Sequence, residues 1–342
     1  MFGMEMELSA VSGATLMELE FAPQEFVVRG LLPNGLSILG GAPKIGKSWL
    51  MLDLALRVAK GEPMWGMETK QGTVLYYCLE DTLQRIQQRL YCITDTAPDN
   101  VLFETATGTL ETDLEEEIIG YLRKYPDMKL IIIDTFQMVR GSKGEPSYGG
   151  DYDDLQKLKR ISDCQKVAIL LVHHLRKMGD RDPVNMLSGT TGISGAADGV
   201  YILDKSDRLE DVATLICTGR DIQPRKLELR FDQTNCVWNV ISDDVEDETK
   251  KLPPEMVAFV DFVKHISFYE GGNTQLAESF CTASGYSMSA KMLKQKMNRW
   301  RHPLSDLGVT FTSREVHSGK IVTVQYTPPV SHASQVSQRS AS

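Results

Sequence analysis

Apolar and polar positions follow two periods along the chain, one typical of strands and one typical of helices. Short apolar runs, the pattern of buried strands, lie at 36–39, 73–79, 101–104, 129–134, 167–173, 199–203, 212–218, 226–231 and 236–241. Helical spacing is found at 47–60, 81–93, 112–125 and 152–165. Strands and helices alternate through residue 175, which predicts a parallel sheet covered on both faces. The later strands have no helices between them, so we expect an antiparallel extension of that sheet.

The pattern changes after residue 242. Residues 243–254 are charged and then proline-bearing, which is typical of a linker. Beyond them, helical spacing runs from Met256 to Phe268, from Thr274 to Phe280 and from Ser289 to Trp300. Two strand-like runs, 309–312 and 321–326, then flank a hairpin signal at 317–320. Three helices followed by a hairpin predict a winged-helix-like α+β domain.

These changes divide the chain into five expected parts. They are an N-terminal arm (1–25), an α/β domain (26–242), the linker (243–254), the winged-helix-like domain (255–328) and a Ser/Gln-rich tail (329–342). The arm shows little pattern, and we expect the tail to be disordered because it has few residues that could form a core.

The clearest chemistry lies between the first predicted strand and the first predicted helix. The phosphate-loop pattern G-x-x-x-x-G-K-[ST] is matched by Gly41, Ala42, Pro43, Lys44, Ile45, Gly46, Lys47 and Ser48, and Trp49 follows it. Glycines let the backbone turn tightly, so that successive N–H groups and the helix N-terminus face phosphates. We therefore expect Lys47 on the β- and γ-phosphates of ATP and the Ser48 hydroxyl on Mg²⁺.

Three more predicted strands end in polar residues at the same carboxyl edge of the sheet. Asp134 ends an apolar strand, the Walker B pattern, and is expected to hold water ligands of Mg²⁺ near Ser48. Glu80 is expected to act as the base for an attacking water, and Asp81 to cap the next helix. A third strand ends in His173 and His174. Such a side chain can sense the γ-phosphate, although a structural role for either histidine stays open.

Six segments occur in an order and spacing that are more specific than any one of them. They are GAPKIGKSW, VLYYCLED, LIIIDT, LLVHHLRK, SGTTGISGAADGVYIL (188–203) and GRD (219–221), and they cover about residues 26–241. On these segments the chain resembles RecA-like P-loop ATPases of the RepA-type hexameric replicative helicase family, AAA-type ATPases of plasmids and other mobile elements.

The resemblance implies a role for each matching residue. Lys47 and Ser48 would bind phosphate and Mg²⁺, Asp134 would bind Mg²⁺, Glu80 would be the catalytic carboxylate and His174 the sensor. Arg220 would act as an arginine finger on the nucleotide of a neighbouring subunit, which implies a homo-oligomeric ring, a hexamer in this family. From the residues alone, pairing of Arg220 with Asp221 or Asp232 stays open, and Arg225 is a second candidate for the finger.

Two regions are candidates for contact with DNA. The loops 137–153 and 175–188, the second with Arg176, Lys177 and Arg181, follow strands that end at the nucleotide and could line a channel for single-stranded DNA. Both could equally be ordinary surface loops. In the C-terminal unit, polar and basic residues recur at helical spacing at Lys291, Lys294, Gln295, Asn298 and Arg301. This spacing suits a recognition helix for duplex DNA, while winged helices also dock proteins.

Composition narrows the choice of protein class. The 42% apolar and 24% charged residues describe an ordinary globular protein, and the net charge of −9 argues against one that coats nucleic acid. The six cysteines form no C-x-x-C pair, which favours reduced thiols over a disulfide framework or a zinc site. The acidic start and the lack of a long apolar run predict a cytoplasmic protein with no membrane partner.

The sequence thus predicts an ATP-hydrolysing DNA motor, a hexameric replicative helicase of a mobile element that translocates on single-stranded DNA. The alternative is an ATP-switched DNA-binding or helicase-loading factor that does not unwind duplex. A small-molecule kinase shares the phosphate loop, but no lid or acceptor site is evident in the sequence.

Overall fold

The computed structural model describes residues 10–19, 21, 23–140, 148–175, 195–205, 207, 210–244, 252–316 and 319–328. The chain forms two compact units that divide near residue 245. Each unit has a hydrophobic core of its own, so each is described by itself.

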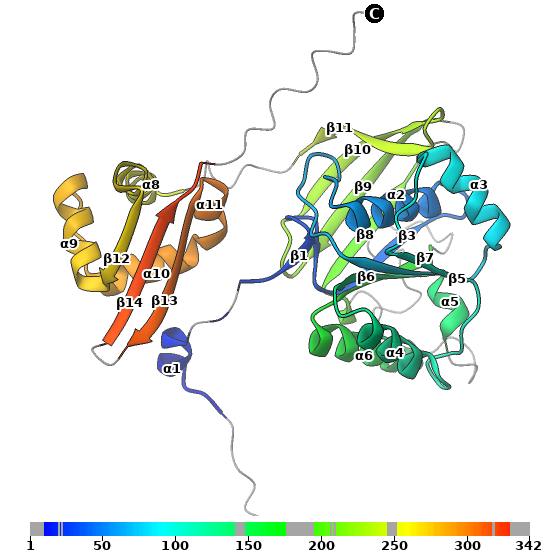
Figure 1. Ribbon diagram of the computed structural model, residues 1–342, viewed down its shortest axis with the longest axis horizontal. Helices are drawn as coiled ribbons and strands as arrows, with labels where there is room; N and C mark the ends of the chain where they lie inside the picture. Colours follow the sequence, from blue (N-terminus) through cyan, green and yellow to red (C-terminus); the bar gives the residue numbers. More distant parts are fainter. Residues whose placement is uncertain are drawn as a thin grey trace, which may run out of the picture. The chain divides into compact units, whose positions relative to one another are not determined.

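The larger unit is built on a central sheet (Figure 1). Over the described residues the sheet has nine strands in the order β11-β10-β9-β8-β3-β7-β6-β4-β5. The strands are β3 (Gly35–Gly41), β4 (Thr73–Cys78), β5 (Val101–Glu104), β6 (Met128–Asp134), β7 (Ala168–His174), β8 (Gly199–Asp204), β9 (Val212–Gly219), β10 (Arg225–Asp232) and β11 (Val237–Asp243). A short hairpin of β1 (Phe26–Val28) and β2 (Leu32–Pro33), which the sequence pattern did not predict, precedes them.

The predicted α/β fold with a mostly parallel sheet is confirmed. Strands β3 to β8 pair in parallel, and β9, β10 and β11 add in antiparallel fashion. We expected the antiparallel extension to begin with the strand at residue 199. This was wrong, because it begins one strand later. Strand β8 pairs with β3 in parallel, and the antiparallel pairing begins between β8 and β9.

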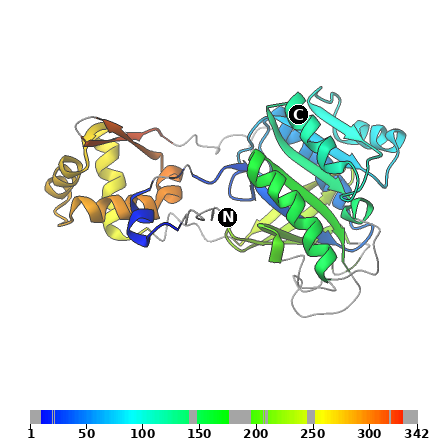
Figure 2. The same ribbon diagram turned by 90° about the horizontal axis from the view of Figure 1, so that it is seen from below.

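Helices cover both faces of the sheet, which explains why its central strands are apolar throughout. Helices α2 (Lys47–Lys60) and α3 (Leu83–Ile93) pack in one core cluster, and α4 (Leu114–Lys124), α5 (Phe136–Val139) and α6 (Tyr148–Gln165) pack in the other. Figures 1 and 2 show these two groups on opposite faces of the sheet. Every residue of β3 and β4 is buried between them.

Helix α3 begins differently from the prediction. Its N-cap is Thr82, whose hydroxyl accepts a hydrogen bond from the backbone N–H of Arg85, so the cap assigned to Asp81 was wrong. The Asp81 carboxylate instead pairs with Arg85 and Arg89 on the helix. Two arginines one turn apart offer a carboxylate stronger hydrogen bonds than a backbone amide does.

The smaller unit consists of helices and a three-stranded antiparallel sheet in the order β12-β14-β13. Its elements are α8 (Pro254–Ile266), β12 (Phe268–Gly272), α9 (Asn273–Ser284), α10 (Ala290–Arg299), α11 (Arg301–Asp306), β13 (Val309–Val316) and β14 (Gly319–Tyr326). The first predicted helix ends two residues early, because Ser267 has a positive φ of 61° and Phe268 pairs with Gln325 in the sheet. Strand β12 was therefore missed.

Several predicted segments are changed by the structure or lie outside the described residues. The loop predicted at 137–153 is shorter, because α5 and α6 occupy its two ends, and residues 141–147 lie outside the description. So do most of the loop 175–188, including Arg176, Lys177 and Arg181, the turn at 317–318 and the tail. In the predicted arm, α1 (Gly13–Glu18) begins at Ser12, whose hydroxyl accepts the Thr15 N–H.

No helix in the described ranges is both long enough and apolar enough to cross a lipid bilayer.

Candidate nucleotide-binding site

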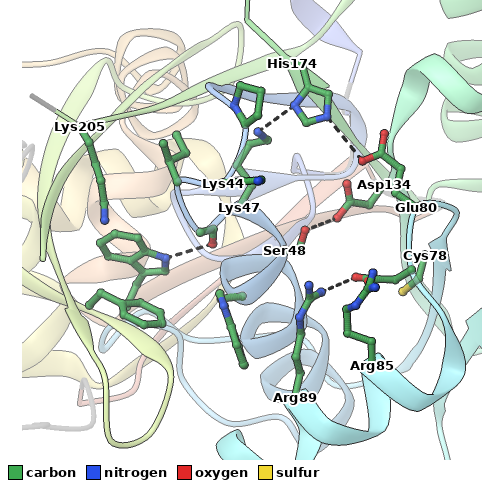
Figure 3. A pocket seen from close by; sticks show the side chains of 17 residues that line it. Lys44, Lys47, Ser48, Cys78, Glu80, Arg85, Arg89, Asp134, His174 and Lys205 are labelled. Atoms are coloured by element: carbon green, nitrogen blue, oxygen red, sulfur yellow. Dashed lines mark hydrogen bonds and ion pairs between the residues drawn. The ribbon is translucent and has the colours of Figure 1, made fainter. Parts of the chain in front are cut away.

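A cleft of about 560 Å³ opens at the carboxyl edge of the parallel strands. The phosphate loop after β3 forms its floor, and Glu80, Asp134 and His174 enter it from the ends of β4, β6 and β7 (Figure 3). Parallel strands deliver their carboxyl ends to one edge, which is why residues far apart in the sequence meet there.

The phosphate loop needs glycine at two places for different reasons. Gly46 has φ = 101°, and a Cβ there would lie 2.9 Å from the Trp238 ring. A Cβ on Gly41 would lie 2.8 Å from the Leu203 carbonyl oxygen. Lys44 also has a positive φ, 64°, so the loop turns sharply before α2 begins. Such a turn directs backbone N–H groups into one concavity, which suits an anion.

Lys47 lies beneath this loop. The side chain is buried, and its Nζ donates to the carbonyl oxygens of Gly41 (2.8 Å) and Ala42 (2.9 Å). Burial lowers the pKa of Lys47 to about 8, although the carboxylates of Asp134 and Glu80 oppose this shift. Desolvation makes the ammonium costly in the free protein, so a phosphate is a favourable partner for it.

Ser48 and Asp134 form the predicted pair of oxygen ligands. The Ser48 hydroxyl donates to Asp134 Oδ2 at 2.7 Å, and the Tyr76 hydroxyl donates to the same oxygen at 3.1 Å. Burial raises the pKa of Asp134, whereas these two hydrogen bonds lower it. The pair fits Mg²⁺, which prefers oxygen ligands and is usually held by one or two carboxylates together with substrate phosphates.

Glu80 and His174 face each other across the upper part of the cleft. Thr135 donates its hydroxyl to Glu80 Oε1 at 3.0 Å, and His174 Nε2 lies 3.6 Å from Glu80 Oε2. The other ring nitrogen, Nδ1, lies 3.3 Å from Lys47 Nζ. His174 therefore connects the phosphate lysine to the exposed carboxylate (Figure 3). His173 points to the opposite face of β7, as strand alternation requires, and its ring packs edge-on against Phe136.

Aromatic and cationic side chains form a part of the cleft that sequence reasoning missed. Trp49 contacts Phe231 with ring centroids 6.2 Å apart, and Phe231 contacts Trp238 at 5.1 Å. The guanidinium of Arg89 lies 5.5 Å from the Trp49 ring. Flat rings beside a guanidinium offer stacking surfaces for a nucleotide base. The available signal was the pair of aromatic residues near the tip of the hairpin 226–241, where Phe231 pairs with Trp238.

Arg220 lies away from this cleft. Its backbone N–H and its guanidinium both bind Asp198, at 2.9 and 3.3 Å, and Nη2 donates to the Gly195 carbonyl. Asp198 bonds the backbone of Leu36 at the start of β3, so Arg220 occupies the amino edge of the sheet. Neither Asp221 nor Asp232, the partners considered from the sequence, pairs with it in the described structure. The alternative finger, Arg225, is nearly buried beside Asp243 and Met67.

The chain is therefore a P-loop ATPase with the RecA-like fold, since its phosphate loop and Walker B carboxylate lie together at the carboxyl edge of a mostly parallel sheet. It belongs to the AAA domain family (AAA_25), whose sequence pattern matches residues 5–180, more than half of the 342 residues.

Comparison with individual proteins gives the same fold class. The DNA repair protein RadA of Streptococcus pneumoniae is 26% identical over 181 residues, which are 51% of this chain and 39% of RadA. RadA of Halalkalibacterium halodurans is 32% identical over 155 residues, 44% of this chain and 30% of that protein. The chain thus spans about two fifths or less of the length of these relatives. A solved structure, the ATPase domain of G40P, matches with a TM-score of 0.51 and 15% identity over 61% of this chain and 85% of that chain, which shows a shared fold.

Proposed function

We propose that the protein hydrolyses ATP in this cleft and uses the reaction to move along single-stranded DNA, as a RepA-type hexameric replicative helicase of a mobile element. The observation that carries the proposal is the convergence of Lys47, the Ser48–Asp134 pair and the Glu80–His174 pair on one cleft. Phosphoryl transfer depends on positioning and charge stabilisation, and these side chains are suited to both.

Each side chain has a distinct task in this proposal. Lys47 exchanges its carbonyl partners for the β- and γ-phosphates, and Ser48 and Asp134 hold Mg²⁺. Bound there, Mg²⁺ would neutralise charge that develops on the phosphoryl oxygens. The exposed Glu80 carboxylate orients the attacking water and accepts its proton, while Thr135 fixes the other carboxylate oxygen.

His174 is proposed as the sensor of the γ-phosphate. It touches Lys47 on one side and Glu80 on the other, so withdrawal of Lys47 toward a phosphate changes both of its contacts. The residue ends β7 and precedes the segment 175–188, which we propose to contact single-stranded DNA. A change at the γ-phosphate would thus pass through His174 to the segment 175–188 and alter its contact with DNA.

Arg220 is proposed as the arginine finger. The distance between the two edges of the sheet prevents it from serving the cleft of its own chain, whereas its half-exposed guanidinium is available to a neighbour. A finger supplied between subunits makes hydrolysis depend on assembly of a ring, which we propose to be a hexamer.

Two observations support DNA as the partner. Relatives that match about half of the chain are named DNA repair proteins. In the smaller unit, the element order α8-β12-α9-α10-α11-β13-β14 and the sheet order β12-β14-β13 favour a winged-helix domain. We propose α10 as its recognition helix, because exposed polar side chains recur along it.

The contacts of α10 refine which side chains would reach DNA. Lys296 is paired with Glu255, and the Arg301 guanidinium lies over the Phe311 ring and donates to its carbonyl oxygen. Arg301 thus supports the domain itself, contrary to the expectation that it faces DNA. Lys291, Gln295 and Arg299 remain exposed at helical spacing, and they form the face that we propose for DNA.

The smaller unit also favours one alternative function. A winged helix that holds duplex DNA suits an ATP-switched DNA-binding or helicase-loading factor, which hydrolyses ATP without unwinding.

The test is ATP turnover with and without single-stranded DNA, together with strand displacement on a forked duplex. We expect turnover that single-stranded DNA stimulates, displacement of the strand, and loss of both in Lys47→Ala. Lys124→Ala, an exposed lysine on α4, serves as the control. Turnover without displacement would favour the loading factor, and normal turnover in Lys47→Ala would contradict the proposed site.

A further inference from the structure

A buried tyrosine reaches the carboxyl edge of the sheet from inside the core. Tyr76 lies on β4, shortly before the strand ends, and is only 2% exposed. Strand β4 pairs in parallel with β6, and Tyr76 lies opposite Ile132, two residues before Asp134. The Tyr76 hydroxyl reaches along the sheet and donates to Asp134 Oδ2 at 3.1 Å. The strand that leads to Glu80 thus contributes a second side chain to this edge, by way of the core.

Packing fixes the position of the Tyr76 ring. Tyr76 belongs to the core cluster that includes the buried residues of α2, and its ring contacts Phe103 of β5 with centroids 6.0 Å apart. A phenylalanine would fill the same space, so the hydroxyl is not needed for packing. A buried hydroxyl costs free energy unless it forms a hydrogen bond. Its place in this core therefore depends on the bond to Asp134.

The Asp134 carboxylate is held at one of its two oxygens. The Ser48 hydroxyl donates to Oδ2 at 2.7 Å, and the Tyr76 hydroxyl donates to the same atom. Among the residues that the structure describes, none donates a hydrogen bond to the other oxygen, Oδ1. The last torsion of an aspartate side chain has broad minima, so a carboxylate with few fixed partners can rotate. Two donors on Oδ2 restrict that rotation and leave Oδ1 available to a ligand.

We propose that Tyr76 is a positioning residue for the divalent-cation site of the cleft. Together with Ser48 it holds Oδ2 of Asp134, so that Oδ1 is left to Mg²⁺ or to a water bound to Mg²⁺. Ser48 also serves as a ligand in the proposed site, whereas the Tyr76 hydroxyl acts on Asp134 alone. Tyr76 is not among the residues that line the described cleft, so it acts through the carboxylate. The inference rests on the proposed ATP site and adds to it a residue from the core.

The expected consequence of losing the hydroxyl is weaker binding of the cation, while binding of the nucleotide without a cation is unchanged. The phosphate loop and Lys47 bind phosphate in the proposed site, and Tyr76 contacts neither of them through its hydroxyl. Removal of a hydrogen-bond partner of a metal ligand typically weakens metal binding about 10- to 100-fold. Tyr76→Phe keeps the ring and removes only the hydroxyl. We therefore expect the strengthening of nucleotide binding by Mg²⁺ to fall about tenfold in this variant.

The next residue of β4 provides a matched control. Tyr77 is also buried, but it belongs to the core cluster on the other face of the sheet, and its hydroxyl donates to Glu117 Oε1 at 3.2 Å. Tyr77→Phe therefore removes the same group, from the same strand, and breaks the same kind of bond to a carboxylate. Both variants should lose some stability in urea, whereas only Tyr76→Phe should change the effect of Mg²⁺.

The experiment measures the Kd of a fluorescent, non-hydrolysable ATP analogue for the full chain, once in EDTA and once in saturating Mg²⁺. The ratio of the two Kd values is the strengthening by Mg²⁺. We expect Tyr76→Phe to match the parent protein in EDTA and to give a ratio about tenfold smaller. Tyr77→Phe should match the parent protein in both conditions. An unchanged ratio in Tyr76→Phe, or an equal fall in both variants, would overturn the proposal.

A double variant tests whether Tyr76 acts through Asp134. Asp134→Asn should already remove most of the strengthening by Mg²⁺, so the addition of Tyr76→Phe should lower the ratio no further. A further fall would overturn the proposed route. The parent protein tests the proposed ATP site separately. No binding of the analogue, or equal binding in EDTA and Mg²⁺, would contradict that site and the inference with it, whereas a failure seen only in the variants would count against Tyr76 alone.

Discussion

The two edges of the central sheet each hold a buried aspartate, and the two carboxylates differ in what surrounds them. At the amino edge, Asp198 accepts the Leu36 N–H at 3.0 Å and the Lys159 ammonium at 2.7 and 2.9 Å, and it pairs with Arg220. At the carboxyl edge, Asp134 accepts hydrogen bonds from the neutral hydroxyls of Ser48 and Tyr76. The nearby ammonium of Lys47 is directed at backbone carbonyls.

The difference separates a structural carboxylate from one that suits the proposed Mg²⁺ site. Asp198 is neutralised by two cations of its own chain, and a buried charge paired in this way is a feature of the fold. The charge of Asp134 is balanced only in part. Burial therefore raises the pKa of its carboxyl group. A cation from outside the chain would complete the balance, as Mg²⁺ does in P-loop ATPases.

Asp134→Asn should have the largest effect on ATP turnover. Loss of the proposed Mg²⁺ ligand is expected to reduce ATP turnover by about 10³-fold, because a metal contributes several kcal/mol to stabilising the transferred phosphoryl group. Stability should be unchanged or slightly higher, since asparagine can still accept a hydroxyl hydrogen bond and carries no buried charge. Turnover at saturating Mg²⁺ and a urea unfolding curve measure the two effects. Normal turnover would contradict the assignment.

Arg220→Ala should leave ATP binding intact and cut hydrolysis by about 10³-fold if the residue is a finger. Arg220→Lys separates this role from a structural one. Lysine keeps a cation beside Asp198 but loses the planar guanidinium, so stability should persist while turnover falls. Arg160→Ala, an exposed arginine paired with Glu115, is the control. An unchanged rate in Arg220→Ala would return the residue to a purely structural role.

Asp198→Asn should show the opposite behaviour to Asp134→Asn. Removing the carboxylate leaves Lys159 without its closest partner and is expected to lower the free energy of unfolding by about 2 kcal/mol, after allowance for the exposed Arg220. ATP binding by the isolated chain should be unaffected, because Asp198 lies at the far edge of the sheet. Equal stability of the variant and the parent protein in urea would remove the contrast between the two aspartates.

The smallest expected effect concerns the proton on Lys47. With a pKa of about 8 in the free protein, the amine is mostly charged at pH 7 and mostly neutral at pH 9. A bound phosphate favours the ammonium, so ATP binding should take up about 0.9 proton at pH 9 and about 0.1 at pH 7. Calorimetry in buffers of different ionisation enthalpy measures the uptake at each pH. Equal uptake at both values would argue against phosphate contact by Lys47.

Sequence alone predicts most of the carboxyl edge, because its residues lie at or just after the ends of parallel strands. A buried parallel strand ends at the carboxyl edge of the sheet. The sequence alone therefore places Glu80, Asp134 and His174 near the phosphate loop. The parallel core of the sheet follows from the same local pattern of strands and helices.

The remainder depends on packing between distant segments, which local patterns do not encode. Trp238 covers Gly46 only because the β10–β11 hairpin folds back over the phosphate loop. Asp81 suits a helix cap by its position, yet two arginines on α3 compete for it successfully. Asp198 gives no signal in the sequence, since its partners Lys159 and Arg220 come from α6 and from the end of β9.

The most direct measurement is a crystal structure of the chain with Mn²⁺ and a non-hydrolysable ATP analogue, with anomalous scattering used to locate the metal. The account predicts a single manganese peak at the cleft, bound by Ser48 Oγ and close to Asp134, with Lys47 Nζ moved from the Gly41 and Ala42 carbonyls to the phosphates. A nucleotide bound elsewhere, or a manganese peak away from Ser48 and Asp134, would contradict it.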